Sequence, residues 1–199
     1  MDGAWNRLVE LFLTTDSEFL FSVHSDIIYL PGTLARLMSW GKPLVGALHF
    51  SKNPPNIPMV YAGVDPNRPH WYNISFDETR AWLEKHQDLL SMSGPAMLEV
   101  APADSLMPVD FTTTGCLLIH RDVLTTMTPP WFVYEYPHGS EDRRFFEAAK
   151  ACGVQGYVDR SVIAGHGDPP VGAAHWLAWD ALRQCVVQDK QSSGEITPA

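Results

Sequence analysis

The stretch FLFSVHSDIIYLPGTL, residues 19–34, predicts a strand that ends in a polar turn and leads on to a helix. Mostly apolar residues run into His24-Ser25-Asp26, and the sequence is then apolar again. Residues i and i+2 of a strand point to the same face, so His24 and Asp26 can converge on one metal ion. The alternative is a polar turn in which Asp26 caps a helix.

Helical and strand patterns alternate along the chain. Apolar spacings of three and four residues predict helices in DGAWNRLVELFLTTD, YLPGTLARLMSWG, SFDETRAWLEKHQDLL and SEDRRFFEAAKACG. Apolar runs predict strands in EFLFSV, PLVGALHF, AMLEVAPA, MPVDFTTTGCLLIH and VQGYVDRSVIAGHG. This alternation predicts an α/β domain over residues 1–180. Residues 181–199 lose apolar content, so we expect a disordered tail there.

Composition narrows the classes of function. The chain has 199 residues and is 45% apolar, which is enough for one domain with a core. A net charge of −9 argues against broad electrostatic binding to nucleic acid or anionic lipid. It does not argue against a small phosphorylated ligand, because a bound metal ion supplies local positive charge.

Cysteines and the N-terminus suggest a compartment. Cys116, Cys152 and Cys185 are widely spaced and form no CxxC pair, so we expect reduced thiols rather than a zinc site. The first residues lack a signal-peptide pattern, and no apolar run is long enough to span a bilayer. These observations predict a cytoplasmic protein.

Four polar clusters border the predicted strands. They are His24-Ser25-Asp26, TTTGC at 112–116, Glu141-Asp142, and His166 in AGHGD. Ligands of open α/β sheets bind at the carboxyl ends of strands, so the four clusters can share one site. Each also has a plainer explanation, such as favourable acidic residues at a helix start for Glu141-Asp142.

In their order, five segments resemble the nucleotide-sugar-dependent glycosyltransferases of the GT-A fold. The first is the strand ending in His24-Ser25-Asp26, at the place of the family's DxD motif. The others are LPGTLARLMSWGKPLVGALHF, TTGCLLIHRDVLTTMTPPWF, SEDRRFFEAAKACGVQGYVD and SVIAGHG. The resemblance runs from about Asn6 to about Gly167. It implies a GT-A-like, Rossmann-like mixed sheet flanked by helices.

The resemblance implies metal-dependent sugar transfer with inversion, from a nucleotide-diphosphate sugar to an acceptor hydroxyl. Asp26 matches the last carboxylate of the metal motif, His24 stands where its first Asp usually stands, and His166 matches a histidine that completes the site. Mn²⁺ or Mg²⁺ would neutralise the leaving diphosphate. The acceptor can be a glycan, a protein or a small molecule.

The resemblance also implies roles in catalysis and in substrate binding. Asp142 matches the general base, and Glu141 would position the acceptor or the helix. The predicted donor- and acceptor-binding residues are Ser25, Thr114, Gly115, Trp131 and Trp71. Among them, Trp131 would stack on a sugar face, and Trp71 belongs to a Pro-rich loop at 51–72 that is either an acceptor wall or a packed surface loop.

The chain departs from this pattern at its start. The family's nucleotide-base-binding unit should lie upstream of Asn6, so we expect a sheet truncated on its N-terminal side. An exposed sheet edge would then favour a homodimer or another partner. The alternatives are a non-catalytic GT-A-like module that binds carbohydrate or a partner, and a metal-dependent hydrolase or nucleotidyltransferase. In a binding module, Asp142 would be locked in an ion pair with Arg143 or Arg144.

Overall fold

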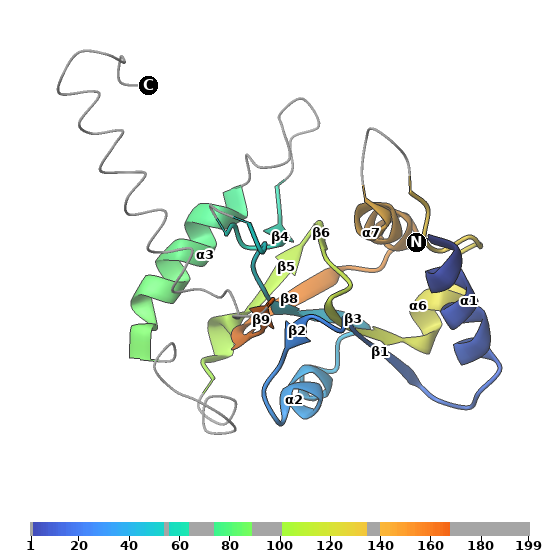
Figure 1. Ribbon diagram of the computed structural model, residues 1–199, viewed down its shortest axis with the longest axis horizontal. Coiled ribbons are helices and arrows are strands. Elements are labelled where there is room, and N and C mark those ends of the chain that lie inside the picture. Colours follow the sequence, from blue (N-terminus) through green and yellow to red (C-terminus); the bar gives the residue numbers. More distant parts are fainter. Residues whose placement is uncertain (1, 54–55, 64–73, 89–100, 135–139, 168–199) are drawn as a thin grey trace, which may run out of the picture.

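The protein is a mixed α/β fold, seen in a computed structural model that describes residues 2–53, 56–63, 74–88, 101–134 and 140–167. Figure 1 shows a central sheet with helices on both faces. The helices are α1 (Asp2–Leu13), α2 (Thr33–Ser39), α3 (Ile74–Lys85), η1 (Ala103–Ser105), α6 (Arg121–Thr126) and α7 (Glu141–Ala151). The strands are β1 (Phe19–Val23), β2 (Ile27–Ile28), β3 (Leu44–Leu48), β4 (Val60–Tyr61), β5 (Leu106–Val109), β6 (Phe111–Thr112), β7 (Cys116–His120), β8 (Gly156–Ile163) and β9 (Gly165–His166).

The main sheet has the strand order β1-β7-β3-β8-β5. β3 and β8 are parallel, whereas β7 is antiparallel to both β1 and β3, and β5 is antiparallel to β8. Consequently β1, β3 and β8 run in the same direction, and their carboxyl ends lie at one edge together with the amino end of β7. Two small ladders, β2–β9 and β4–β6, stand outside this sheet.

Alternate residues of the central strands build two separate cores. Leu44 and Leu48 of β3 face the larger core with α1, α3, α6 and α7, whereas Val45 and Ala47 face a smaller core with α2. A strand covered on both faces needs apolar residues at every position, which the fully buried β3 provides. The strand predicted in PLVGALHF is therefore confirmed, and it lies at the centre of the sheet.

Local signals set the position of α7, the helix that brings Asp142 to the sheet. Ser140 Oγ accepts a hydrogen bond from Arg143 N at 3.4 Å and is the N-cap of the helix. Gly153, with φ of +81°, follows the helix in a left-handed conformation that favours glycine. Phe145 and Phe146 are fully buried and fix the helix against the sheet.

The predicted elements differ from the structure in the segment MPVDFTTTGCLLIH. It forms three strands rather than one, because β5 pairs with β8, β6 pairs with β4, and β7 crosses to the space between β1 and β3. The Pro-rich loop at 51–72 contains the short strand β4. Most of AMLEVAPA, part of the Pro-rich loop at 51–72 and the tail at 181–199 lie outside the described residues.

A buried ion pair fixes α2 to β8. Asp159 has no exposed surface, and its Oδ2 accepts hydrogen bonds from Arg36 Nε at 2.9 Å and Trp40 Nε1 at 2.7 Å. Its Oδ1 accepts one from Ser161 N at 2.9 Å. The β3–β8 pairing shifts register just after Asp159, so the carboxylate satisfies backbone and side-chain donors where the ladder is interrupted.

Two further expectations are tested only in part. No helix within the described residues has both the length and the apolar content needed to cross a membrane. Cys116 is a buried free thiol and Cys152 an exposed one, whereas Cys185 lies outside the described residues. β1 is an edge strand of the described sheet, which agrees with the expected exposed edge. A homodimer formed through such an edge stays a prediction.

Candidate functional site

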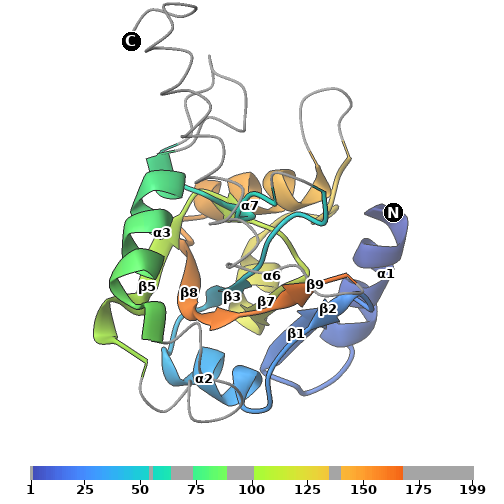
Figure 2. The same cartoon turned by 60° about the vertical axis from the view of Figure 1, so that its left-hand side comes forward.

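Five of the sequence-predicted site residues gather at the edge of the sheet where β1, β3 and β8 end: Asp26, His24, His166, Thr114 and Asp142. Asp26 follows β1 in a turn, closed by a hydrogen bond from Ile27 N to His24 O at 3.2 Å. Figure 2 shows β8 turning into β9, which runs beside β2. In this ladder Ile27 pairs with His166, so the predicted pair Asp26 and His166 is brought together.

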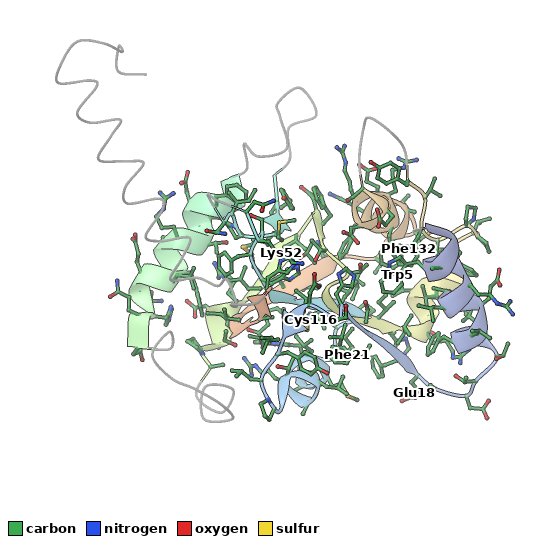
Figure 3. All side chains as sticks on the ribbon, viewed as in Figure 1. Trp5, Glu18, Phe21, Lys52, Cys116 and Phe132 are labelled. Carbon is green, nitrogen blue, oxygen red and sulfur yellow. The ribbon has the colours of Figure 1, made fainter. Side chains whose placement is uncertain are left out.

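The Asp26 carboxylate is engaged by a lysine that sequence analysis did not single out. Lys52 Nζ donates a hydrogen bond to Asp26 Oδ2, and the two side chains form an ion pair. This contact lowers the pKa of Asp26 below its ordinary value. Figure 3 places Lys52 near the centre of the view, away from Trp5 and Phe132, which stack on each other beside α1.

His166 reaches the same carboxylate from β9. Its Nδ1 lies 2.6 Å from the carbonyl oxygen of Phe50, and a carbonyl only accepts, so we assign the ring proton to Nδ1. The Nε2 atom of His166 then faces Asp26 Oδ2 at 3.7 Å. Asp26, Lys52 and His166 thus form one polar group, which we call the Lys52 cluster.

A second polar group joins α7 to the loop before β7. Asp142 Oδ1 accepts hydrogen bonds from Thr114 Oγ1 at 2.8 Å and from Thr114 N at 3.2 Å. Because the single hydroxyl proton of Thr114 goes to Asp142, we assign the proton of His24 to Nε2, which lies 3.2 Å from Thr114 Oγ1. Asp142, Thr114 and His24 form what we call the Asp142 cluster.

The surroundings of Asp142 favour its protonated form more than water does. Burial raises the pKa of Asp142, while the hydrogen bonds from Thr114 act in the opposite direction. Burial also raises the pKa of Tyr61 to about 12, and the charge of Asp142 contributes to that increase. Tyr61 is therefore a further residue of this environment, and it stacks on Phe111 at 4.2 Å between ring centroids.

His49 lies between the two clusters and is almost fully buried. Its Nε2 is hydrogen-bonded to Thr113 Oγ1, and its ring centroid lies 5.9 Å from that of His166. A Cβ atom on Gly115 would lie only 3.2 Å from His49 Nε2 and 3.3 Å from Ile27, so the absence of a side chain at Gly115 permits this packing. Burial, followed by the neighbouring charge of His166, lowers the pKa of His49 to about 4.

We predict that the free energy of unfolding decreases as pH falls from about 6.5 to about 4, because of His49. The unfolded chain takes up the proton at the higher pH and the folded chain at the lower, so acid favours unfolding in this window. The contribution is roughly 3 kcal/mol over the full range. Urea unfolding of His49→Gln across this range should show a smaller dependence on pH, whereas His120→Gln, at a partly exposed histidine, should keep that of the wild type. Equal dependence in all three proteins would contradict the prediction.

Sequence analysis missed Lys52, His49 and Thr113, and it included Tyr61 in the Pro-rich loop predicted as an acceptor wall or a packed surface loop. His49 directly follows β3, as His24 follows β1, so the rule that located His24 applies to it as well. Thr113 lies within the TTTGC segment that was singled out. Lys52 and Tyr61 lie in the Pro-rich loop at 51–72, and no local pattern shows where such a loop folds back.

The remaining predicted residues lie outside the two clusters. Glu141 is the first residue of α7 and stands beside Asp142, whereas Ser25 is exposed in the turn before β2. Trp131 is 7% exposed in the larger core, and its Nε1 donates to Leu124 O at 2.8 Å, so its ring offers little surface to a sugar. Trp71 lies outside the described residues.

The three predicted metal ligands do not converge. Asp26 and His166 belong to the Lys52 cluster, whereas the Nε2 atom of His24 is directed to Thr114 in the other cluster. The described residues contain no group of three or more His, Cys, Asp or Glu side chains placed to hold a metal ion. The ammonium group of Lys52 already contacts Asp26 Oδ2, the carboxylate oxygen that His166 Nε2 faces. The arrangement therefore does not fit the predicted metal site.

Comparison with known proteins gives a fold relative and no family. No protein-family model matches the chain, and no curated protein matches it. Among solved structures, the crystal structure of A197 from STIV aligns with a TM-score of 0.52 at 15% sequence identity. The alignment covers 83% of this chain and 66% of that chain, so the present chain spans just under two thirds of the length of A197. A likeness at this identity shows a shared fold alone.

These comparisons contradict the family resemblance that the sequence segments suggested. No glycosyltransferase family accounts for the chain, so its assignment to the GT-A family is wrong. The structure explains why the segments were misleading. Ser140-Glu141-Asp142 is a helix start, and Thr114-Gly115 precedes a buried strand. Such patterns are expected in an α/β fold of any family.

Proposed function

We propose that the chain transfers a sugar from a nucleotide-diphosphate sugar to an acceptor hydroxyl, with inversion and with Asp142 as the general base. The observation that carries this proposal is the state of the Asp142 carboxylate. Arg143 and Arg144 form ion pairs with Glu147, at 2.7 Å and 2.8 Å. Within the described residues Asp142 has no ion pair, and it receives hydrogen bonds from Thr114. A carboxylate of this kind is available to take a proton.

The chemistry of the two clusters supports the proposal. A hydroxyl is a poor nucleophile until a base within hydrogen-bond reach removes its proton, which is the role of Asp142. A raised pKa makes this carboxylate a stronger base than an ordinary aspartate. A leaving diphosphate develops negative charge, and Lys52 lies at the same edge of the sheet to meet it. A GT-A-like arrangement of the sheet is the more specific expectation for the fold, and it stays a prediction.

The proposal is tested by incubating the full chain with a panel of UDP- and GDP-linked sugars and measuring released nucleotide diphosphate. Release above the rate in buffer, increased by a hydroxyl acceptor, is the expected result. Asp77→Asn, which changes an exposed carboxylate on α3, should leave the rate unchanged. Absence of release from every donor would contradict the proposal. Sugar binding without nucleotide binding would instead support the binding-module alternative.

A further inference from the structure

The contact between Lys52 and Asp26 places a cationic side chain where the sequence predicted a metal ion. Lys52 Nζ and Asp26 Oδ2 are in direct contact, and both side chains remain partly exposed, at 47% and 40%. Two cations cannot share one carboxylate oxygen at this range without strong repulsion. A divalent ion would therefore have to displace Lys52 before it could use Asp26 Oδ2, the oxygen that faces His166, as a ligand.

The geometry leaves the lysine free to contact a second anion. An ammonium group has three N–H donors, and Asp26 accepts one of them. An ion pair between partly exposed side chains contributes little stability, so it holds Lys52 in place without preventing it from turning to a more highly charged ligand. His166 Nε2 lies beside the same point, 3.7 Å from Asp26 Oδ2.

We propose that Lys52, held by Asp26 and flanked by His166, supplies the positive charge that binds a diphosphate group, and that this binding needs no divalent cation. The choice of a diphosphate as ligand rests on the proposed function. The replacement of the cation by Lys52 rests on the geometry of the cluster. Asp26 is then a positioning residue for Lys52 rather than a metal ligand.

The first test measures binding of inorganic pyrophosphate to the full chain by calorimetry in the presence of EDTA. The wild type should bind, and Lys52→Ala should weaken binding by about tenfold or more, since one close charge contact is lost. Lys42→Ala is the matched control. Lys42 precedes β3 at its opposite end and lies over the ring of Tyr157 at 4.9 Å, so its removal should leave the affinity unchanged.

The second test asks whether a cation and the lysine compete for the same place. Removing the ammonium group leaves Asp26 Oδ2 and His166 Nε2 facing each other, and both atoms are suitable ligands for Mn²⁺. Added Mn²⁺ should therefore restore pyrophosphate binding to Lys52→Ala, while changing wild-type binding less than about twofold. The double variant Lys52→Ala with Asp26→Asn should not be restored, because the carboxylate ligand is lost.

The outcomes separate this inference from the proposed function. Wild-type binding that is abolished by EDTA, or binding that Lys52→Ala leaves intact, would overturn the inference, and so would a failure to bind pyrophosphate at all. Pyrophosphate binding through Lys52 without release from any nucleotide sugar would support the inference and contradict the proposed function. Nucleotide release that requires Mn²⁺ would support the proposed function and contradict the inference.

Discussion

Asp142→Asn should reduce the rate of sugar transfer by roughly 10²–10⁴-fold while leaving donor binding within about twofold of the wild type. The amide keeps the size of the side chain and can still accept from Thr114, but it cannot take up the acceptor's proton. The measurement is nucleotide release with acceptor present, together with calorimetric binding of the nucleotide diphosphate. Asp122→Asn, an exposed acidic residue in the first turn of α6, is the matched control and should retain activity.

The pH dependence of the wild type gives an independent check on the same residue. A general base must be ionised, so the rate falls as pH decreases through its pKa. Because burial raises the pKa of Asp142, the acidic limb of the profile should lie at a higher pH than an ordinary aspartate gives. Transfer by Asp142→Asn within tenfold of the wild type, or an acidic limb in the ordinary range, would show that another group is the base.

Asp159→Ala should lower the free energy of unfolding by about 3–5 kcal/mol, which is typical of removing one partner from a buried ion pair. The change leaves Arg36 Nε and Trp40 Nε1 without their common acceptor, the fully buried Asp159 carboxylate. It also removes the acceptor for Ser161 N where the β3–β8 register shifts. Urea unfolding measures the loss.

Asp77→Ala is the control for this effect, since Asp77 is exposed and pairs with Arg80 at 3.4 Å. Its removal should change the unfolding midpoint little, because exposed ion pairs contribute little. A comparable loss of unfolding free energy in both variants would mean that the contacts of Asp159 stabilise the fold no more than an exposed ion pair does. The expected difference identifies Asp159 as structural, although it is a charged residue in the strand that leads to His166.

The sequence predicted the sheet better than it predicted the site. The mostly apolar run PLVGALHF indicated a strand, and the apolar spacing in SEDRRFFEAAKACG indicated a helix, because both signals are local. The pairing of Asp26 with His166 was also anticipated, since both residues follow strands. The Lys52 contact was not anticipated, because it depends on how a Pro-rich loop folds back over 26 positions of the chain.

Two wrong expectations have the same physical origin. Trp131 was expected to face a sugar, but a buried tryptophan needs only one acceptor for its N–H, and Leu124 O provides it inside the core. His24 was expected to join Asp26, but the turn after β1 directs its ring to Thr114. Residue type and spacing are compatible with either orientation, and only tertiary packing decides between them.

The contacts of the site join distant parts of the chain, and this has a consequence for folding. His24 and Thr114 are 90 positions apart, and Phe50 and His166 are 116 apart. Closing such long loops costs entropy that is recovered only when the central strands have paired, so no short fragment contains the site. A ligand that binds there binds only the native chain. Its presence should raise the temperature of unfolding in proportion to the logarithm of its concentration, so that the melting temperature reports occupancy of the site even before any reaction is known.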